Sequence, residues 1–412
     1  MNNEKKVPVR DLAVKDKFSL VRFLFSWEMV LIYILIGINI WLLMTRPGLY
    51  FAPGTIQSII QSGMDLSPLV LGMVFVLIIG DIDVSVASTM IISAMTTGLS
   101  MEAGIPAVLA VLFGVLTGVA CGAFNGFLIA YIKMPAVIVT ISTQLLFRGI
   151  VMIVLDVNVL REFPAFYTAL AWRNLAGIPV SLLVFLLMAV VFMIVLHKSS
   201  FGRKLYLIGN NATAAKYSGV NVEGIRMSVF MIMGMMAGVA SIFFVGRMGG
   251  GVSSTMGTGY ELNAIAICVL GGVSTNGGKG KIFGPVLGTL IMAFLIFTLG
   301  LLDVPANERV ILVGLILITA VLIPNLNQEL LARLKLKFLY AENKNIEALN
   351  NKTAENIRNL KKLILEVKKD EQLSSLEKEE KIKKHEVEIV NLKKKCKKQT
   401  AEMKKETKRA IK

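Results

Sequence analysis

The chain has 412 residues, of which 55% are hydrophobic and only 17% are charged, and its mean hydropathy is +0.67. A soluble protein of this length carries a charged fraction nearer a quarter, so the composition excludes an ordinary soluble globular domain. Repeated apolar runs of about 20 residues are long enough to cross a bilayer as helices. The sequence therefore predicts an all-α, polytopic transmembrane helix bundle.

The formal net charge of +16 is concentrated near the C-terminus. Residues 331–412 contain 24 Lys and Arg against 13 Asp and Glu. We expect a cytoplasmic N-terminal segment (1–27), a transmembrane domain (28–326) and a Lys/Glu-rich cytoplasmic tail (327–412). Three scattered cysteines and two distant histidines predict no metal site, disulfide frame, cofactor or catalytic centre, and no nucleic-acid partner is expected.

About ten transmembrane helices are predicted from hydropathy. They cover residues 28–45, 55–79, 84–101, 105–131, 135–155, 178–197, 227–247, 261–273, 282–300 and 308–324. Lysine and arginine gather in the first 25 residues, in the 197–226 loop and in the tail, which the positive-inside rule assigns to the cytoplasm. An even number of spans then places both termini there. The polar N-terminus lacks a short apolar core with a cleavage site, so no signal peptide is expected.

The stretch GDIDVSVAS (80–88) places Asp81 and Asp83 at the junction of the second and third predicted spans. A carboxylate deep in a bilayer costs about 3 kcal/mol or more and usually has a function. Two interpretations stand equally. Both residues lie in a wetted inner turn with Asp83 capping the next helix, or the helices break within the membrane and Asp83 and Ser85 approach a central pathway.

The fourth predicted span carries a regular glycine pattern. Gly114, Gly118, Gly122 and Gly126 recur every fourth residue and so share one helix face. Glycine lets the backbones of neighbouring membrane helices approach closely, which favours a helix-packing role. Asn125 beside this face either lines a polar path or bridges two helices. In the fifth span, Arg148 follows Gln144 by one turn. Its side chain either snorkels toward an interface or pairs with a carboxylate on a neighbouring helix, and structural pairing is favoured.

The inner loop LYLIGNNATAAKYSGVNVEGIR (205–226) is expected to contain a short helix. Asn210 or Asn211 would cap it, Ala214 and Ala215 would lie within it, and Gly219 would close it. Such a helix fits a groove on a partner, although an ordinary amphipathic connector has the same spacing.

The stretch GGVSTNGGKGK (271–281) is rich in glycine and ends in lysine, as phosphate-binding loops do. In such loops two glycines five residues apart are followed directly by Lys and then Ser or Thr. Here Gly272 and Gly277 have that separation, but Gly278 occupies the lysine position and Gly280 follows Lys279. No βαβ pattern surrounds the stretch, so the sequence excludes a nucleotide site here.

The tail repeats an apolar residue every seven positions, at Ile382, Ile389, Cys396 and Met403. Ser374 and Gln399 interrupt the wider heptad pattern. A charged helix that forms a weak coiled coil and a solvated, partly disordered extension both fit, and the extension is favoured. Anionic membrane lipid or a cytosolic protein would be the partner of its lysines.

Four motifs together resemble the membrane subunit of bacterial ABC importers for sugars, the ribose/arabinose/xylose/rhamnose-type permeases. They are GDIDVSVAS, GAFNGFLIAYIKMPAVIVTIST, GRKLYLIGNNATAAKYSGVNV and GTGYELNAIAICVLGGVSTNGGKGKIFGPVLGTL. They follow the family's order and cover about residues 25–325.

The resemblance implies a multi-pass subunit of the bacterial inner membrane that pairs with a second permease subunit, the same chain or a paralogue. A separate cytosolic ATPase would hydrolyse ATP, and a periplasmic or lipid-anchored binding protein would deliver a monosaccharide. The 209–221 segment would be the helix coupled to the ATPase. Its contact residues would be Gly209, Asn210, Ala214, Ala215, Ser218 and Gly219.

The pathway residues expected from this reading are polar side chains of the membrane part. They are Asp83, Ser85, Asn125 and Asn263. The chain departs from the family pattern at Asp81 and Ala87, where glycines are usual, and at Ala212-Thr213, where an acidic pair is common.

Three alternatives remain at this stage. An ion-coupled secondary transporter would use Asp81, Asp83 and Arg148 in a proton relay. A membrane-embedded enzyme is disfavoured by the scarcity of histidine and the absence of a sizeable soluble domain. The same importer class carrying a nucleoside or a furanosyl signalling molecule would share every motif.

Overall fold

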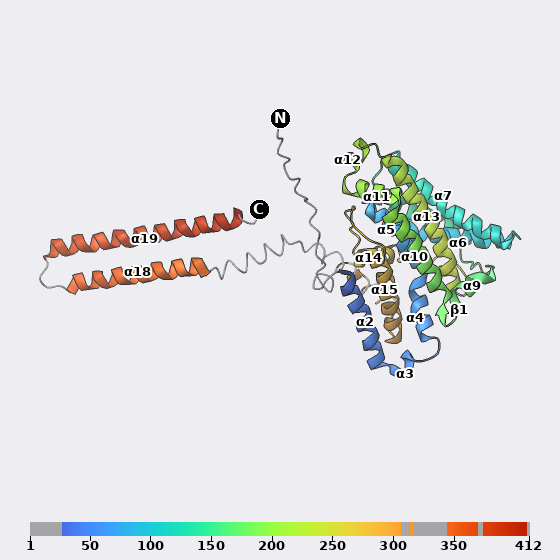
Figure 1. Cartoon of the computed structure of the whole chain (residues 1–412), viewed down its shortest axis with the longest axis horizontal. Helices are drawn as coiled ribbons and strands as arrows, with labels where there is room; N and C mark the ends of the chain where they lie inside the picture. The colour runs from blue at the N-terminus through green and yellow to red at the C-terminus, as the bar shows by residue number, and fades with distance from the viewer. Residues whose placement is uncertain are drawn as a thin grey trace, which may run out of the picture. The chain divides into compact units, whose positions relative to one another are not determined.

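A computed structural model describes residues 27–305, 344–369 and 374–409, with single positions at 308, 311, 314, 315 and 318. The chain divides into two compact units, Met1–Pro324 and Asn325–Lys412, which are described separately below (Figure 1). The expected N-terminal segment therefore lies almost wholly outside the described residues.

Helices build the described part of the first unit, with one short β-hairpin. In chain order the elements are α2 (Trp27–Thr45), α3 (Pro47–Tyr50), α4 (Thr55–Met64), α5 (Ser67–Ile78), α6 (Val86–Glu102), α7 (Ala107–Ala130), α8 (Ala136–Leu155), α9 (Ala165–Trp172), β1 (Asn174–Leu175), β2 (Ile178–Pro179), α10 (Val180–Lys198), α11 (Ser200–Asn210), α12 (Ala212–Tyr217), α13 (Val222–Arg247), α14 (Tyr260–Leu270) and α15 (Phe283–Leu301).

Seven helical segments of the described residues are long and apolar enough to cross a membrane. They are Trp27–Thr45, Thr55–Ile78, Ala107–Ala130, Ala136–Leu155, Val180–Lys198, Val222–Arg247 and Phe283–Leu301. Each matches a predicted span. Of the other three predicted spans, α6 has 17 residues and α14 has 11, whereas 308–324 lies outside the described residues apart from single positions. The protein is a multi-pass helical bundle.

Three local predictions need correction. The span expected over 55–79 is interrupted at Asp65 and Leu66, where α4 ends and α5 begins. Helix α13 begins at Val222, five residues before the expected start, because Asn221 accepts a hydrogen bond from the Gly224 amide and caps it. The segment before α10 contains α9 and the antiparallel β1–β2 pair, neither of which was predicted.

Helix α5 forms the centre of the bundle, and all of its residues are buried. Its sequence SPLVLGMVFVLI is apolar on every side after the first turn, as a fully enclosed helix requires. It contacts α13, α14, α10 and α11, while α2 packs along α15 (Figure 1). Figure 1 also shows α12 at one end of the bundle, hereafter the α12 end, and α3 at the other.

The glycines of α7 lie where neighbouring backbones come closest. A Cβ atom at Gly118 would overlap the carbonyl oxygen of Gly234 on α13, and one at Gly122 would overlap that of Phe230. Gly126 faces Met227, which is also on α13, and Gly114 faces Thr97 of α6. The glycines at every fourth position thus line the contact of α7 with α13, and Gly114 and Gly118 also approach α6.

The second unit is a helical hairpin of α18 (Lys344–Lys369) and α19 (Ser375–Arg409). Of the two expectations for the tail, these residues therefore take the helical one. The least exposed positions recur in heptads, including Ile357, Leu360 and Ile364 on α18 and Ile382 and Ile389 on α19. Cys396 of the predicted heptad donates to Asn350 Oδ1 across the pair (3.4 Å).

Candidate functional site: the α12 end and the α5–α6 junction

The glycine loop 271–281 uses its backbone to hold other elements together. The Gly278 amide donates to the carbonyl oxygen of Ile78, the last residue of α5 (2.8 Å), and the Tyr206 hydroxyl of α11 donates to the Gly280 carbonyl (2.7 Å). A Cβ at Gly209 would overlap both the Ile78 carbonyl and the Gly278 amide. The loop, α11 and the end of α5 therefore meet in direct backbone contact.

Tyr206 is partly buried at this contact, and its burial raises the pKa of its hydroxyl. The hydroxyl therefore remains protonated and is available as the donor to Gly280 over the ordinary pH range.

The predicted short helix is present as α12. Asn211 caps it by accepting a hydrogen bond from the Ala214 amide (2.9 Å), and Gly219 follows it with φ +80°. Ala215 is buried against the bundle, whereas Ala214 and Ser218 are exposed, with Ser218 Oγ donating to the Ala214 carbonyl (3.0 Å). One small residue thus anchors α12 while its opposite face is open.

Asn210 ends α11 rather than capping α12. Its side-chain amide donates to the Tyr206 carbonyl one turn earlier (2.8 Å), and its oxygen lies beside Gly278 of the glycine loop. Asn210 therefore belongs to the junction with the loop, and Asn211 alone performs the capping role that the sequence left open between them.

Three of the four expected pathway residues form one buried hydrogen-bonded cluster. The Ser85 hydroxyl and amide both donate to Asp83 Oδ1 (2.7 and 2.9 Å), and Asn125 Nδ2 of α7 donates to Ser85 Oγ (2.8 Å). Asp83 is 3% exposed, and Asn125 Oδ1 is buried with no partner among the described residues. Asn263 on α14 is not part of this network.

The turn that carries the two aspartates combines features of both interpretations. Residues 81–84 form an irregular turn between α5 and α6, yet Asp81 and Asp83 are both buried. Asp83 does not occupy the N-cap position, which Ser85 takes, but it binds the amide at that end. Both carboxylates are therefore largely enclosed by protein, and Asp81 also lines the cavity described below.

Charged residues of the rival proton relay lie in separate clusters. Asp81 Oδ1 accepts from Arg226 at the start of α13 (2.9 Å). Arg148 donates to the carbonyl oxygens of Ser254 and Met256 (3.0 and 2.7 Å), so its structural partners are carbonyls rather than the expected carboxylate. Gln144 donates to Glu261 of α14 (3.2 Å). Without a hydrogen-bonded link among Asp81, Asp83 and Arg148 in the described part, the relay loses its support.

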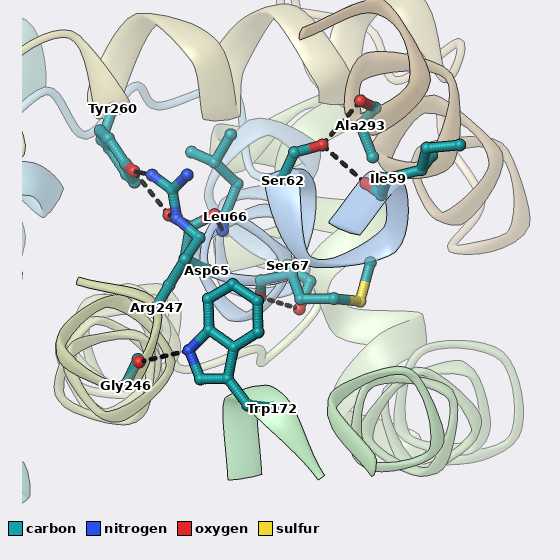
Figure 2. Close-up of polar contacts among 11 residues, drawn as sticks. Ile59, Ser62, Asp65, Leu66, Ser67, Trp172, Gly246, Arg247, Tyr260 and Ala293 are labelled. Atoms are coloured by element: carbon teal, nitrogen blue, oxygen red, sulfur yellow. Dashed lines mark hydrogen bonds and ion pairs between the residues drawn. The ribbon is translucent and has the colours of Figure 1, made fainter. Parts of the chain in front are cut away.

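A second buried cluster escaped the sequence reasoning. Arg247 Nε contacts Asp65 Oδ2 (2.7 Å), Arg247 also donates to the Tyr260 hydroxyl (2.7 Å), and Tyr260 donates to Asp65 (2.5 Å). Figure 2 shows the three side chains converging from the α4–α5 break, the end of α13 and the start of α14. An aspartate within a predicted span is the signal that would have indicated it.

This cluster fixes helix ends rather than offering a site. Trp172 donates to the carbonyl of Gly246, next to Arg247 (3.2 Å), and Ser62 donates to Ala293 of α15 (2.7 Å) (Figure 2). Breaking the span at Asp65 thus lets one carboxylate tie α13 and α14 together.

Comparison with known proteins places the chain in a transport family. The family described as branched-chain amino acid transport system / permease component matches residues 55–321. An autoinducer 2 import system permease protein LsrC of Yersinia enterocolitica is 33% identical over 74% of this chain and 86% of its own length. Its counterpart in Yersinia pseudotuberculosis is 32% identical over 74% and 90%. No solved structure matches.

The chain therefore belongs to this family of permease components, and the resemblance to sugar-type ABC permeases drawn from its motifs is confirmed. The family is that of a transport subunit of the membrane rather than an enzyme. The match ends before α18 and α19, so the hairpin lies outside it.

Proposed function

We propose that this protein is the membrane subunit of an ABC importer of the bacterial inner membrane, through which a small polyhydroxylated solute passes. A separate cytosolic ATPase hydrolyses ATP, an extracytoplasmic binding protein delivers the solute, and a second permease subunit completes the pathway. The family match and the names of the relatives support this class. Termini on the cytoplasmic side follow from the charge distribution.

One observation carries the mechanism, namely the backbone contact of Gly209 with Ile78 and Gly278. Atoms in van der Waals contact transmit a displacement without compression, because packed protein interiors are nearly incompressible. A push on α12 therefore moves α11 and, through Gly209, the end of α5. The α5–α6 junction that follows contains Asp83 and Ser85, so the displacement reaches the polar cluster.

The exposed face of α12 is the proposed docking surface for the ATPase. Tyr217, the last residue of α12, is 89% exposed. Ala214 and Ser218 are also exposed and are small enough for close contact with a partner. The pathway residues Asp83, Ser85 and Asn125 offer hydrogen-bonding groups to hydroxyls but are almost fully buried, and we assign selection of the solute to the binding protein.

A monosaccharide is the cargo that the motifs favour, and a furanosyl signalling molecule is the second candidate. The second is favoured by one observation, that the relatives reported above are autoinducer 2 import permeases. Hydroxyl groups on either cargo can donate to and accept from Asp83, Ser85 and Asn125, so the same polar cluster serves both.

The class is tested by reconstituting the chain in vesicles with the ATPase and the binding protein encoded beside it. We expect ATP-dependent uptake of D-ribose or of autoinducer 2, whichever the binding protein retains. Uptake that follows a pH gradient and ignores ATP would select the secondary transporter instead.

The coupling role of α12 is tested by Gly219→Val. Gly219 has φ +80° and no atom within 4 Å of a Cβ position, so the substitution strains the backbone without a clash. A β-branched residue there costs about 1–2 kcal/mol, whereas Asn tolerates this conformation. We expect Gly219→Val to abolish solute-stimulated ATP hydrolysis and Gly219→Asn to retain it. Unchanged stimulation in Gly219→Val would remove α12 from the mechanism.

A further inference from the structure

A cavity of about 330 Å³ opens at the α12 end, beside the α5–α6 junction. Its walls come from the end of α7, the turn before α8 and the first turn of α13, with apolar contributions from Met134 and Val222. Its polar lining consists of four charged side chains, Asp81, Lys133, Glu223 and Arg226. The volume is sufficient for a monosaccharide-sized ligand, since ligand pockets begin near 300 Å³.

The buried pair in this cavity retains unused hydrogen-bonding capacity. Asp81 is 7% exposed and binds Arg226 through Oδ1 only. Asp81 Oδ2 and Arg226 Nε are buried and have no hydrogen-bond partner in the described part of the chain. Both atoms lack exposed surface, so a ligand that supplies a donor and an acceptor would satisfy them once the pair turns toward the cavity, and this is favoured because unsatisfied buried polar atoms are costly.

The charge balance restricts the chemistry of that ligand. Two carboxylates face one ammonium and one guanidinium, and Glu223 is already paired with Lys216 outside the cavity. A net charge on the ligand would therefore meet repulsion from one pair or the other. A hydroxyl group donates to a carboxylate and accepts from a cation, so a neutral polyhydroxylated molecule satisfies both sides.

The cavity also lies next to the α5–α6 junction that contains the polar cluster, because Asp81 lines the cavity and Asp83 is two residues further along the chain. Asp81 and Asp83 flank Ile82, whose carbonyl accepts from Thr140 of α8 (3.3 Å). We propose that the Asp81–Lys133–Arg226 cavity is a release site, where the polyhydroxylated solute binds after leaving Asp83, Ser85 and Asn125 and before it enters the cytoplasm. This inference rests on the proposed function, whose cargo class it shares.

The test is direct binding to the full-length chain in lipid nanodiscs, by saturation-transfer-difference NMR with D-ribose and with autoinducer 2. Lys133→Asn is the first variant, because Lys133 has φ 64°, which Asn tolerates, and its ammonium is in no ion pair among the described residues. Asp81→Asn is the second. Lys281→Gln is the matched control, since Lys281 pairs with Glu28 and does not line the cavity.

We expect saturable binding of at least one probe to the wild type and to Lys281→Gln. Lys133→Asn should weaken it by about fivefold, the effect of one lost hydrogen bond, and Asp81→Asn by more. The inference is overturned if the wild type shows no saturable binding. It is also overturned if Lys133→Asn and Asp81→Asn both bind the probe as tightly as the wild type.

Uptake by the complete importer is measured in parallel to separate the two claims. ATP-dependent uptake without probe binding to the isolated chain contradicts the release site and leaves the importer function standing. Failure of the complete importer to take up any solute with ATP contradicts the proposed function itself.

Discussion

Two long helix pairs, α7–α13 in the bundle and α18–α19 in the tail, associate by different means. Between α7 and α13 the contact is backbone against backbone, with Gly118 facing Gly234 and Gly122 facing Phe230. Between α18 and α19 it consists of aliphatic side chains in heptads, with Ile389 the most buried residue. In both pairs the contact residues recur at regular intervals. They are glycines in α7 and large aliphatic residues in α18 and α19.

The solvent explains the difference. In lipid, burying a leucine against another helix gains little, so membrane helices associate through close packing of small residues. In water, removal of aliphatic surface from solvent drives association, and large side chains are favoured. The chain thus uses glycine between helices that are expected to be surrounded by lipid. It uses isoleucine or leucine between the helices of its charged tail.

The largest expected effect is that of Gly122→Ala on the bundle. The new Cβ would overlap the Phe230 carbonyl, so α7 and α13 must separate, and overpacking of this kind costs about 1–3 kcal/mol or more. The matched control is Gly149→Ala in α8, where a Cβ meets no atom within 4 Å. Thermal unfolding of the purified proteins in detergent should show loss of stability in Gly122→Ala alone. Equal stability of the two variants would break the comparison.

A comparable effect, confined to the hairpin, is expected from Ile389→Ala. Ile389 is 9% exposed, and truncation of a buried isoleucine costs about 2 kcal/mol or more. Hydrogen exchange of the full-length protein should accelerate in α18 and α19 and remain unchanged in α7 and α13. Val390→Ala, at a side chain that is 51% exposed, serves as the control and should leave both unchanged. Acceleration in the bundle as well would show that the two pairs are not independent.

The smallest effect concerns the start of α19. Glu377 accepts from the Ser374 amide and hydroxyl (3.1 and 3.0 Å), and these hydrogen bonds lower the pKa of its carboxyl. Because the folded-state pKa is lowered, the stabilisation is present above the ordinary pKa and is lost as the pH falls through the lowered value.

Hydrogen exchange at the first turn of α19 therefore distinguishes wild type from Glu377→Ala at neutral pH and no longer does so once the pH lies below the lowered pKa of Glu377. Glu379→Ala, at an exposed carboxylate on the same turn, is the control and should match wild type throughout. A difference between wild type and Glu377→Ala that persists in acid would exclude the carboxylate as its cause.

Local signals in the sequence were sufficient for most of the helices and for α12. Hydropathy located the long spans, and rules that act within a few residues indicated an Asn cap for α12, at 210 or 211, and Gly219 at its end. The recurrence of glycine at every fourth residue indicated the packing face of α7 for the same reason. Each of these features depends on residues that are neighbours in sequence.

Features that join distant segments were not predictable in this way. Asp65 and Tyr260 are 195 residues apart, and no pattern around either one names the other. The β1–β2 pair has two residues per strand, too few for an alternation to be recognised. Asp83, Ser85 and Asn125 were each selected as polar residues in apolar surroundings, but only the fold shows that Asn125 binds Ser85.

The central claim is that energy from a separate ATPase enters through α12. Tyr217 on α12 and Leu175 on β1, both exposed, are each replaced in turn by the photoreactive benzoylphenylalanine, and the reconstituted importer is irradiated. The account predicts a cross-link to the ATPase from position 217 and none from position 175. A cross-link from 175, or ATP-driven uptake with no cross-link from 217, would contradict it.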